Sequence, residues 1–359
     1  MKMEDIARLA GVSKAAVSLA FNGKPGIGDE TRERILSIAG RAGYKPRTRA
    51  QSQEVVADTS GDRAMTALLF LVIANSGIVT SQYDRQPFFR ELIHFLEQGS
   101  RAGGFPLLIS AIDMERFDED LRAIAELHSE RGVILLGTNL DKGTLSRIAE
   151  RLPKLVVLDT CFETLPIPFV YTNNPLGGYQ AGNWLCRSGH RAIGYVASNV
   201  RIPNFDARRK GFDEAMREWG TEVMSEHEFA VDPMVPAAQD SFKDGIERLR
   251  TEGKPLPTAL FCESDFIAIC AMKSLAELGI RVPEQVSVIG FDDISEAVIV
   301  SPELTTVRVN KEKMVRSAVR LATEAIEAPS GEAVKIAIDT VIIERRSSSP
   351  APSLTSDAD

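Results

Sequence analysis

Residues 5–46 read DIARLAGVSKAAVSLAFNGKPGIGDETRERILSIAGRAGYKP, and this stretch decides the fold of the N-terminal part of the chain. Apolar residues recur three and four positions apart in Glu4 to Ala10, which predicts a helix with one buried face. Ser13 is a good N-cap for a second helix, Lys14 to Phe21. A third predicted helix starts at Asp29 or Thr31 and runs to about Ala42. The stretch therefore predicts three short helices, the first two joined by a tight turn.

Charge separates this small head from the rest of the chain. The first 50 residues carry ten Lys and Arg against five Asp and Glu, although the whole chain has a net charge of -8. A basic head on an acidic body favours binding to phosphates, and a tight helix-turn-helix places its second helix in the major groove of DNA. The alternative is a generic helical domain with a solvated basic surface.

Composition limits the class of protein. The chain has 359 residues, of which 44% are hydrophobic and 26% charged, which excludes a wholly disordered chain and suggests two or three domains. No apolar run approaches the roughly 20 residues of a membrane-spanning helix. The N-terminus lacks the apolar region of a signal peptide, so we expect a cytoplasmic protein. The four cysteines are scattered without a CxxC motif, which indicates reduced thiols and no metal site.

Beyond the head, apolar strand-like runs alternate with amphipathic helical stretches, which predicts buried parallel strands joined by helices. So many strands suggest two Rossmann-like subdomains with a ligand cleft between them. The predicted strands are Ala67–Ile73, Pro106–Ser110, Gly132–Leu136, Leu155–Leu158, Phe169–Tyr171, Ala192–Val196, Ala259–Phe261 and Val286–Gly290. The predicted helices are Pro87–Ala102, Phe117–Ser129, Gly177–Arg187, Asp206–Trp219, Gln239–Glu252, Asp265–Leu278 and Lys311–Ala325.

The sequence offers no catalytic constellation. No phosphate-binding glycine fingerprint follows a strand, the GxSxG, HExxH and GxxxxGK[ST] motifs do not occur, and the four histidines are dispersed. We therefore expect no enzyme activity, no catalytic residue and no cofactor. A periplasmic solute-binding protein shares the two-subdomain body, but it would need a signal peptide and no helix-turn-helix.

Residues 5–46 resemble the DNA-binding domain of the LacI/GalR family of bacterial transcription regulators, nearly without gaps. The resemblance implies that the opening of the second helix reads base edges, through Lys14, Ala15 and position 19. It places four polar side chains near phosphates, namely Ser13, Ser18, Asn22 and Tyr44. Ser13 serves equally well as a helix cap. Members of the family usually carry Arg where this chain has Leu19, so we expect the operator to differ at that base or to be read less strictly there.

The connector departs most from the family pattern. The family has a hinge helix that ends in Ala-Arg-Ser-Leu, whose Leu wedges into the minor groove. This chain has Ala50-Gln51-Ser52-Gln53, with Gln53 at the wedge position. Either Val55 or Val56 takes over the wedge in a shifted hinge, or the segment is a flexible linker.

Residues from about 68 to 345 resemble the effector domain of the same family. The strongest match is PTALFCESDFIAICAMKSLAELGIRVPEQVSVIGFDDISEAVIVSPELTTVRVN, at residues 257–310. The resemblance implies a periplasmic-binding-protein-like type I body whose cleft binds a small effector. A sugar is favoured, although the same residue types also suit nucleosides. The implied effector-binding residues are Phe88, Phe89, Asp159, Asn173, Asn204, Arg208, Asp265 and Asp292.

These residues have distinct implied roles. The aromatic pair would stack on a ring, Arg208 would donate to hydroxyls or a carboxylate, and Asp292 would accept protons from ligand hydroxyls. Asp265 serves equally well as a cap of the helix that follows it. Asp206 stands where many relatives have another Arg, which leaves the charge of the effector open.

The resemblance also implies the organisation of the whole chain. We expect a small all-α helix-turn-helix head at 1–46, a hinge or linker at 47–66, and an α/β body at 67–346. Within the body, subdomain one should hold about 67–172 and 304–328, and subdomain two about 173–303 and 329–346. A disordered tail should follow at 347–359. The expected function is operator binding by a homodimeric transcription regulator, a repressor, whose DNA affinity is controlled by the effector.

Overall fold

The computed structural model describes residues 3–13, 16, 17, 20, 27–41, 67–232, 237–327 and 332–351. The chain divides into two compact units, Met1–Arg63 and Ala64–Asp359, which we call the head and the body and describe separately.

The head contains α1 (Met3–Ala10) and α3 (Asp29–Arg41), and residues 16, 17 and 20 between them are also helical. Six small or branched side chains are buried together in its core, namely Ala7, Ala10, Val17, Ala20, Ile35 and Ala39. The backbone N–H of Ala16 donates to Ser13 Oγ over 3.2 Å, the geometry of a helix N-cap. The capping role weighed for Ser13 is therefore present in the structure.

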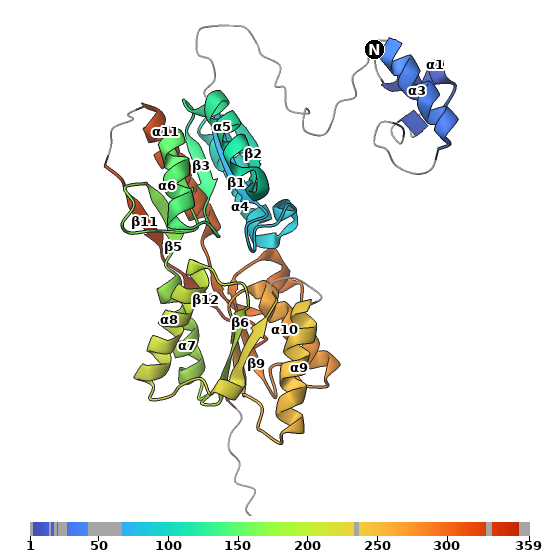
Figure 1. Ribbon diagram of the computed structural model, residues 1–359. Helices are drawn as coiled ribbons and strands as arrows, with labels where there is room; N and C mark the ends of the chain where they lie inside the picture. The colour runs from blue at the N-terminus through green and yellow to red at the C-terminus, as the bar shows by residue number, and fades with distance from the viewer. Residues whose placement is uncertain are drawn as a thin grey trace, which may run out of the picture. The chain divides into compact units, whose positions relative to one another are not determined.

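The first sheet of the body is wholly parallel, with strand order β11-β5-β4-β3-β1-β2. Its strands are β1 (Leu68–Ala74), β2 (Leu107–Asp113), β3 (Val133–Leu136), β4 (Leu155–Leu158), β5 (Phe169–Thr172) and β11 (Lys335–Ile338). Alternate side chains of β1 point to opposite faces. Leu68, Phe70 and Val72 pack with α4 (Pro87–Ala102) and α11 (Lys311–Glu327). Leu69 and Leu71 pack with α5 (Phe117–His128) and α6 (Lys142–Arg151) on the other face (Figure 1).

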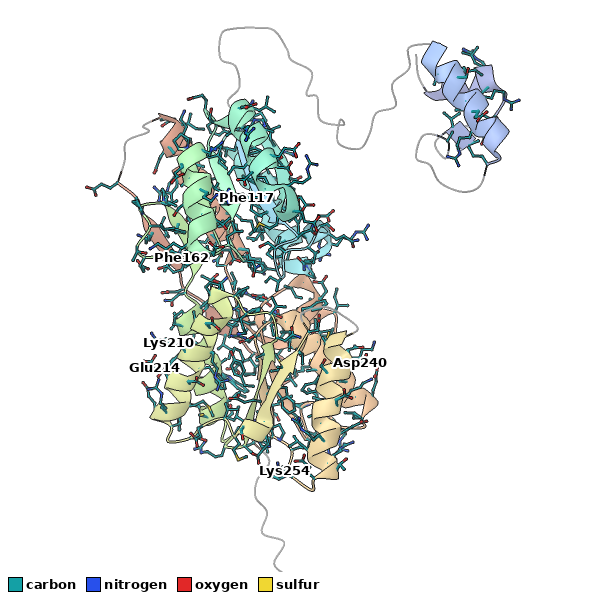
Figure 2. The ribbon with its side chains drawn as sticks, viewed as in Figure 1. Phe117, Phe162, Lys210, Glu214, Asp240 and Lys254 are labelled. Atoms are coloured by element: carbon teal, nitrogen blue, oxygen red, sulfur yellow. The ribbon has the colours of Figure 1, made fainter. Side chains whose placement is uncertain are left out.

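The second sheet has the order β12-β10-β9-β8-β6-β7 and is parallel except for β12, which runs antiparallel to β10. Its strands are β6 (Ile193–Ser198), β7 (Glu228–Val231), β8 (Ala259–Cys262), β9 (Ser287–Asp292), β10 (Thr305–Arg308) and β12 (Val341–Ile343). One face packs on α7 (Asn174–Arg187) and α8 (Pro203–Glu218), the other on α9 (Ala237–Thr251) and α10 (Asp265–Glu277). Figure 2 shows the charged Lys210 and Glu214 of α8 and Asp240 of α9 on the outer surface. The predicted α/β body of two Rossmann-like subdomains is confirmed.

The points at which the chain crosses between the subdomains differ from the expectation. We expected residues 304–328 in subdomain one, but β10 pairs with β9 of the second sheet, Thr305 opposite Ile289. We expected residues 329–346 in subdomain two, but β11 pairs with β5 of the first sheet. Among the described elements after β10, α11 and β11 return to subdomain one, and β12 then lies again in the second sheet.

The expected disordered tail begins later than residue 347. Ser347 is fully buried, its hydroxyl donates to Val288 O over 2.6 Å, and it accepts the backbone N–H of Thr305 over 2.8 Å. The backbone N–H of Ala351 donates to Ser188 O over 2.8 Å. Residues up to 351 therefore form part of the second subdomain, because they satisfy its backbone groups. Residues 352–359 lie outside the described part of the chain.

Candidate functional site

A cavity of about 510 Å³ lies where the carboxyl ends of strands from the two sheets face each other. The segments after β1, β3 and β4 line one side, and those after β6, β8 and β9 line the other. Ligands of parallel α/β sheets bind at this edge, because the loops there are free to vary. The fold thus places one cleft between two sets of strand ends.

Six of the eight effector-binding residues implied by the sequence line this cleft, namely Phe88, Phe89, Asp159, Asn204, Arg208 and Asp292. They come from α4 and the end of β4 on one side, and from α8 and the end of β9 on the other. Asn173 and Asp265 do not line it.

Arg208 is held from several directions at the floor of the cleft, where only 4% of it is exposed. Its Nε donates to Asn174 Oδ1 over 2.9 Å, and its terminal nitrogens donate to Glu263 O and, over 3.3 Å, to Asp292 Oδ1. Its guanidinium carbon lies 3.7 Å from the ring centroid of Phe291. This fixed geometry leaves a planar set of donors beside a carboxylate, which suits vicinal hydroxyls.

Two strand-end carboxyls face the same space from opposite subdomains. Asp159 and Asp292 both have left-handed backbone conformations, with φ of 71° and 117°. Burial raises the pKa of Asp159 to about 7, although Thr138 donates to its Oδ2 over 2.5 Å. Burial also raises the pKa of Asp292, against the opposing effect of Arg208. Carboxyls in this setting accept hydrogen bonds from ligand hydroxyls in place of water.

The aromatic pair divides into two roles. Phe89 is 6% exposed and packs in the core with Leu92 and Leu96 of the same helix. Phe88 is only partly buried, and its ring meets that of Phe89 edge-on at 5.7 Å. Both contribute to the cleft wall, and Phe88 presents the larger accessible surface to a ligand.

Asn173 and Asp265 act outside the cleft. Asn173 accepts the backbone N–H of Leu176, as the N-cap of α7, and donates to Asp339 Oδ1 over 2.8 Å. Ser264, and not Asp265, caps α10. Asp265 is fully buried and accepts the backbone N–H of Ile294 over 2.9 Å, which braces the loop after Asp292.

Some residues of the site were not anticipated. Thr138 lines the cleft, and the fully buried Glu263 accepts hydrogen bonds from Tyr195 Oη and Arg201 behind it. Glu263 directly follows β8, and Thr138 follows β3 after one glycine, so a polar residue close to a strand end was the available signal. Arg85, in the short helix η2 (Tyr83–Arg85), also lines the cleft, but it belongs to a long loop whose course the sequence does not show.

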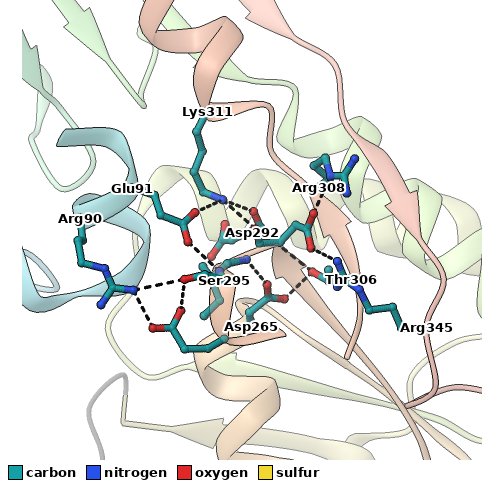
Figure 3. Close-up of polar contacts among 12 residues, drawn as sticks. Arg90, Glu91, Asp265, Asp292, Ser295, Thr306, Arg308, Lys311 and Arg345 are labelled. Atoms are coloured by element: carbon teal, nitrogen blue, oxygen red, sulfur yellow. Dashed lines mark hydrogen bonds and ion pairs between the residues drawn. The ribbon is translucent and has the colours of Figure 1, made fainter. Parts of the chain in front are cut away.

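Polar contacts join the two subdomains beside the cleft (Figure 3). The Lys311 ammonium, at the start of α11, donates to Asp292 O over 2.6 Å and pairs with Glu91 over 3.0 Å. Glu91 of α4 also accepts the backbone N–H of Ser295 over 2.7 Å. The neighbouring Arg90 pairs with Glu296 over 2.8 Å. We call Arg90, Glu91, Lys311 and the 292–296 loop the interdomain bridge.

The loop of the bridge is also fixed from the second subdomain. Burial by itself would raise the pKa of Asp293, but hydrogen bonds from Arg308 and Arg345 lower it below its ordinary value. Asp293 is therefore a stable anion that holds the loop to β10 and to the segment after β12.

The proposed DNA-reading residues fall almost entirely outside the described part of the chain. Of them the structure describes Ser13 alone, as the cap given above. The residues not described are Lys14, Ala15, Ser18, Leu19, Asn22, Tyr44, Ala50, Gln53, Val55 and Val56. Across the described ranges, no group of three potential ligands could hold a metal ion, and no helix is long and apolar enough to span a membrane.

The head and the body each match the model of a known family. Residues 2–47 match the model of bacterial regulatory proteins of the lacI family, and residues 183–348 match a periplasmic binding protein-like domain. The chain therefore carries a lacI-family DNA-binding domain and a periplasmic-binding-protein-like domain. The resemblance seen in the sequence is thereby confirmed, and this protein is a DNA-binding regulator of transcription.

Relatives and solved structures are similar to this chain over nearly its whole length. The ribose operon repressor of Haemophilus influenzae is 29% identical over 96% of this chain and 98% of its own. A probable HTH-type transcriptional repressor ExuR of Bacillus subtilis is 28% identical over 96% and 97%. The transcriptional regulator CelR–cellobiose complex superposes with a TM-score of 0.68 at 23% identity, covering 97% of this chain and 99% of that one. A lac repressor dimer bound to operator gives a TM-score of 0.65 at 19% identity, covering 97% and 99%.

Proposed function

We propose that this lacI-family regulator is a repressor whose operator affinity is set by a polyhydroxylated effector, most simply a sugar, in the cleft between the subdomains. The observation that carries the proposal is the buried Arg208–Asp292 pair, which lies on the cleft wall with donors and acceptors held side by side. Sugar hydroxyls both donate and accept, so they can replace water on both partners at once.

Three further groups complete this chemistry. Asp159 offers a second carboxyl from the opposite subdomain, Asn204 lies beside it, and Phe88 offers a ring to the apolar face of a sugar. Asn204 Nδ2 donates to Asp159 O over 2.9 Å, so the effector would bind where the subdomains already touch. The cellobiose complex among the structural neighbours and the ribose operon repressor among the relatives support a sugar.

The coupling to DNA follows from this position. An effector held by Arg208 and Asp292 on one side and by Asp159 and Phe88 on the other favours the closed body. Closure would then alter the spacing of the two body subdomains at a dimer interface and change the order of the 47–66 hinge. Lys14 and Ala15 of the head would read base edges, with Leu19 unable to make a bidentate contact to guanine. The effector can only shift this equilibrium by its differential affinity for the two states.

We further propose a homodimer that reads a palindromic operator, without enzyme activity and in the cytoplasm. Exposed apolar side chains support self-association: Ile109 on the edge strand β2 is 41% exposed, and Val298 and Ile299 are 53% and 77% exposed. Closed two-fold dimers match two half-sites of a palindrome.

A thermal-shift screen of the full-length protein tests the effector proposal. The panel contains neutral sugars, sugar acids, sugar phosphates, nucleosides and purines. A ligand at 100 times its Kd stabilises the folded state by about 2.7 kcal/mol, which is enough to detect. A sugar that shifts the wild type, but neither Arg208→Ala nor Asp292→Ala, supports the site. Stabilisation by purines or nucleosides alone, or a sugar shift that both variants retain, contradicts it.

A further inference from the structure

The loop between β1 and α4, residues 75–86, forms one wall of the cleft. Ile78, Thr80, Ser81, Gln82, Arg85 and Gln86 all line the cavity. The loop is held in place: Gln86 Nε2 donates to Ile78 O over 2.9 Å, and Asn139 Nδ2 donates to Ser76 Oγ over 3.2 Å. Its side chains are therefore presented to the ligand from a fixed backbone.

A glycine in this loop confirms how closely it is fitted to the body. Gly77 has a left-handed φ of 55°, and a Cβ there would collide with the side chain of Asn139. Only glycine adopts this conformation and this close approach without strain. The loop is thus docked on the segment that follows β3, and it carries η2 and Arg85 to the cleft mouth.

Arg85 is a basic residue of the cleft wall, and no described acidic side chain forms an ion pair with it. Its side chain is exposed, and its Nη1 donates a long hydrogen bond of 3.4 Å to Gln82 Oε1. By contrast, Arg208 and Asp292 pair with each other, and Asp159 accepts a hydrogen bond from Thr138. The positive charge of Arg85 is left available to whatever occupies the cleft.

We infer that the effector is an anionic polyol, a sugar acid or a sugar phosphate, and that Arg85 selects it by binding its charged group at the cleft mouth. This inference rests on the proposed function, because the hydroxyls of the same ligand occupy the Arg208–Asp292 end. A guanidinium fork matches the oxygens of a carboxylate or phosphate and binds them more strongly than it binds a hydroxyl.

The other charges of the cleft permit an anion. Asp292 is offset by Arg208, and Lys311 lies behind it against Asp292 O. Asp159 has its pKa raised to about 7 by burial, so part of it is uncharged near neutral pH. The net charge of the lining is therefore near zero, and Arg85 at the mouth decides the sign of the ligand.

Matched pairs of probes test the inference on the full-length protein by calorimetry. The pairs are D-glucose with D-glucuronate, D-glucose with D-glucose 6-phosphate, and D-ribose with D-ribose 5-phosphate. We expect the anionic member of one pair to bind at least tenfold more tightly than its neutral partner. The pair that shows this preference distinguishes a carboxylate from a phosphate.

Variants assign the preference to Arg85. Arg85→Gln should abolish it, losing at least about tenfold in affinity for the anion with little change for the neutral member. Arg85→Lys should retain part of it. Arg116→Gln, an exposed arginine of the same subdomain outside the cleft, should change neither.

The outcomes separate the inference from the proposed function. If a neutral sugar binds as tightly as its anionic partner, or if Arg85→Gln keeps the preference, the inference is overturned and the polyol site stands. If no member of any pair binds while the protein still binds its operator, the inference and the polyol proposal both fail.

Discussion

Three buried aspartates lie in the cleft or directly behind it. Asp159 and Asp292 face the ligand space. Asp265 accepts hydrogen bonds from Ile294 N, in the loop after Asp292, and from Thr306 Oγ1 of β10, and so braces that loop. Burial raises the pKa of both Asp159 and Asp265 to about 7, and the charge of Asp292 adds to the rise at Asp265. The site is therefore assembled at a cost to the stability of the folded body near neutral pH.

The sign of this cost gives a pH prediction at a single residue. The pKa of Asp265 rises from 3.8 to about 7 on folding, so between these values the folded state binds more protons than the unfolded state. Its contribution to stability is full below about pH 4 and is lost as the pH rises through 7. Asp265→Asn removes this loss, so the stability of the variant relative to wild type should rise by about 2 kcal/mol from pH 5 to pH 8.

Urea unfolding at the two pH values measures this difference. Asp240→Asn, which replaces an exposed carboxyl on α9, is the matched control and should give no comparable change. An Asp265→Asn difference that is the same at pH 5 and pH 8 would show that Asp265 does not titrate in this range.

At the residue scale, the sequence predicts the position of side chains that end a strand or directly follow one. Asp159 follows LVVL and Asp292 ends the strand SVIGFD, so both could be placed at the carboxyl edge from the pattern. Ser264 and Asp265 could not be assigned, because either side chain can cap a helix that begins there. Arg85 could not be found, since its position depends on how a long loop folds back on Asn139.

At the scale of elements, the packing of α7 on α8 fixes Arg208. The two helices approach so closely that a Cβ on Gly211 would collide with Pro175 O, and one on Gly178 would collide with Arg208 O. Backbone atoms cannot yield as a flexible side chain can, so the glycines set the separation of the helices and the height of Arg208 at the cleft floor.

Gly211→Ala should therefore lower the free energy of unfolding by about 2–3 kcal/mol and weaken effector binding, because α8 must move outward. Gly99→Ala is the matched control in α4, where the added Cβ meets only Val315 and Val319 at 3.6 Å. That variant should be neutral or more stable by about 0.5–1 kcal/mol. Chemical denaturation and calorimetry measure both effects. Equal stability of the two variants would contradict the packing argument.

The interdomain bridge gives a second prediction at this scale. Lys311 is 4% exposed and bonds to Asp292 O, Asp293 O and Glu91. Lys311→Met leaves these acceptors buried without their cation, which should lower the free energy of unfolding by about 3 kcal/mol. Lys313→Met, on the exposed side of the same helix, should change it by less than about 0.5 kcal/mol.

A loss of stability in Lys311→Met no larger than in Lys313→Met would show that the bridge contributes nothing to the folded body. Urea unfolding of both variants at one pH decides the matter.

Most elements with continuous apolar runs could be predicted from the sequence, and the short ones could not. β1, β3, β4 and β9 fall within a residue or two of their predicted runs. β7, β11 and β12 are short, half-exposed strands, so they carry no such run. The assignment of β10 and β11 to opposite sheets depends on which strand each one pairs with, and local pattern holds no information on that choice.

At the scale of the whole molecule, the body is two layered subdomains joined by three short crossings. They lie between β5 and α7, between β10 and α11, and between β11 and β12. Each subdomain has its own sheet, and beside the cleft polar contacts join the two, such as the ion pair of Arg90 with Glu296 and the hydrogen bond from Lys311 to Asp292 O. Polar interfaces of this kind permit relative motion of two rigid parts. A ligand bound to both parts can then shift the body between two arrangements.

The most direct test of the account is the affinity of the full-length protein for its operator, with and without effector. The operator is a duplex selected from random DNA by the protein itself, and the effector is the ligand that the thermal-shift screen identifies. At saturation we expect the Kd for DNA to change by about 5- to 150-fold in the wild type, the usual range of allosteric coupling. In Asp292→Asn the same ligand concentration should leave the Kd unchanged. An operator affinity that stays constant while the ligand saturates the wild-type cleft would contradict the account.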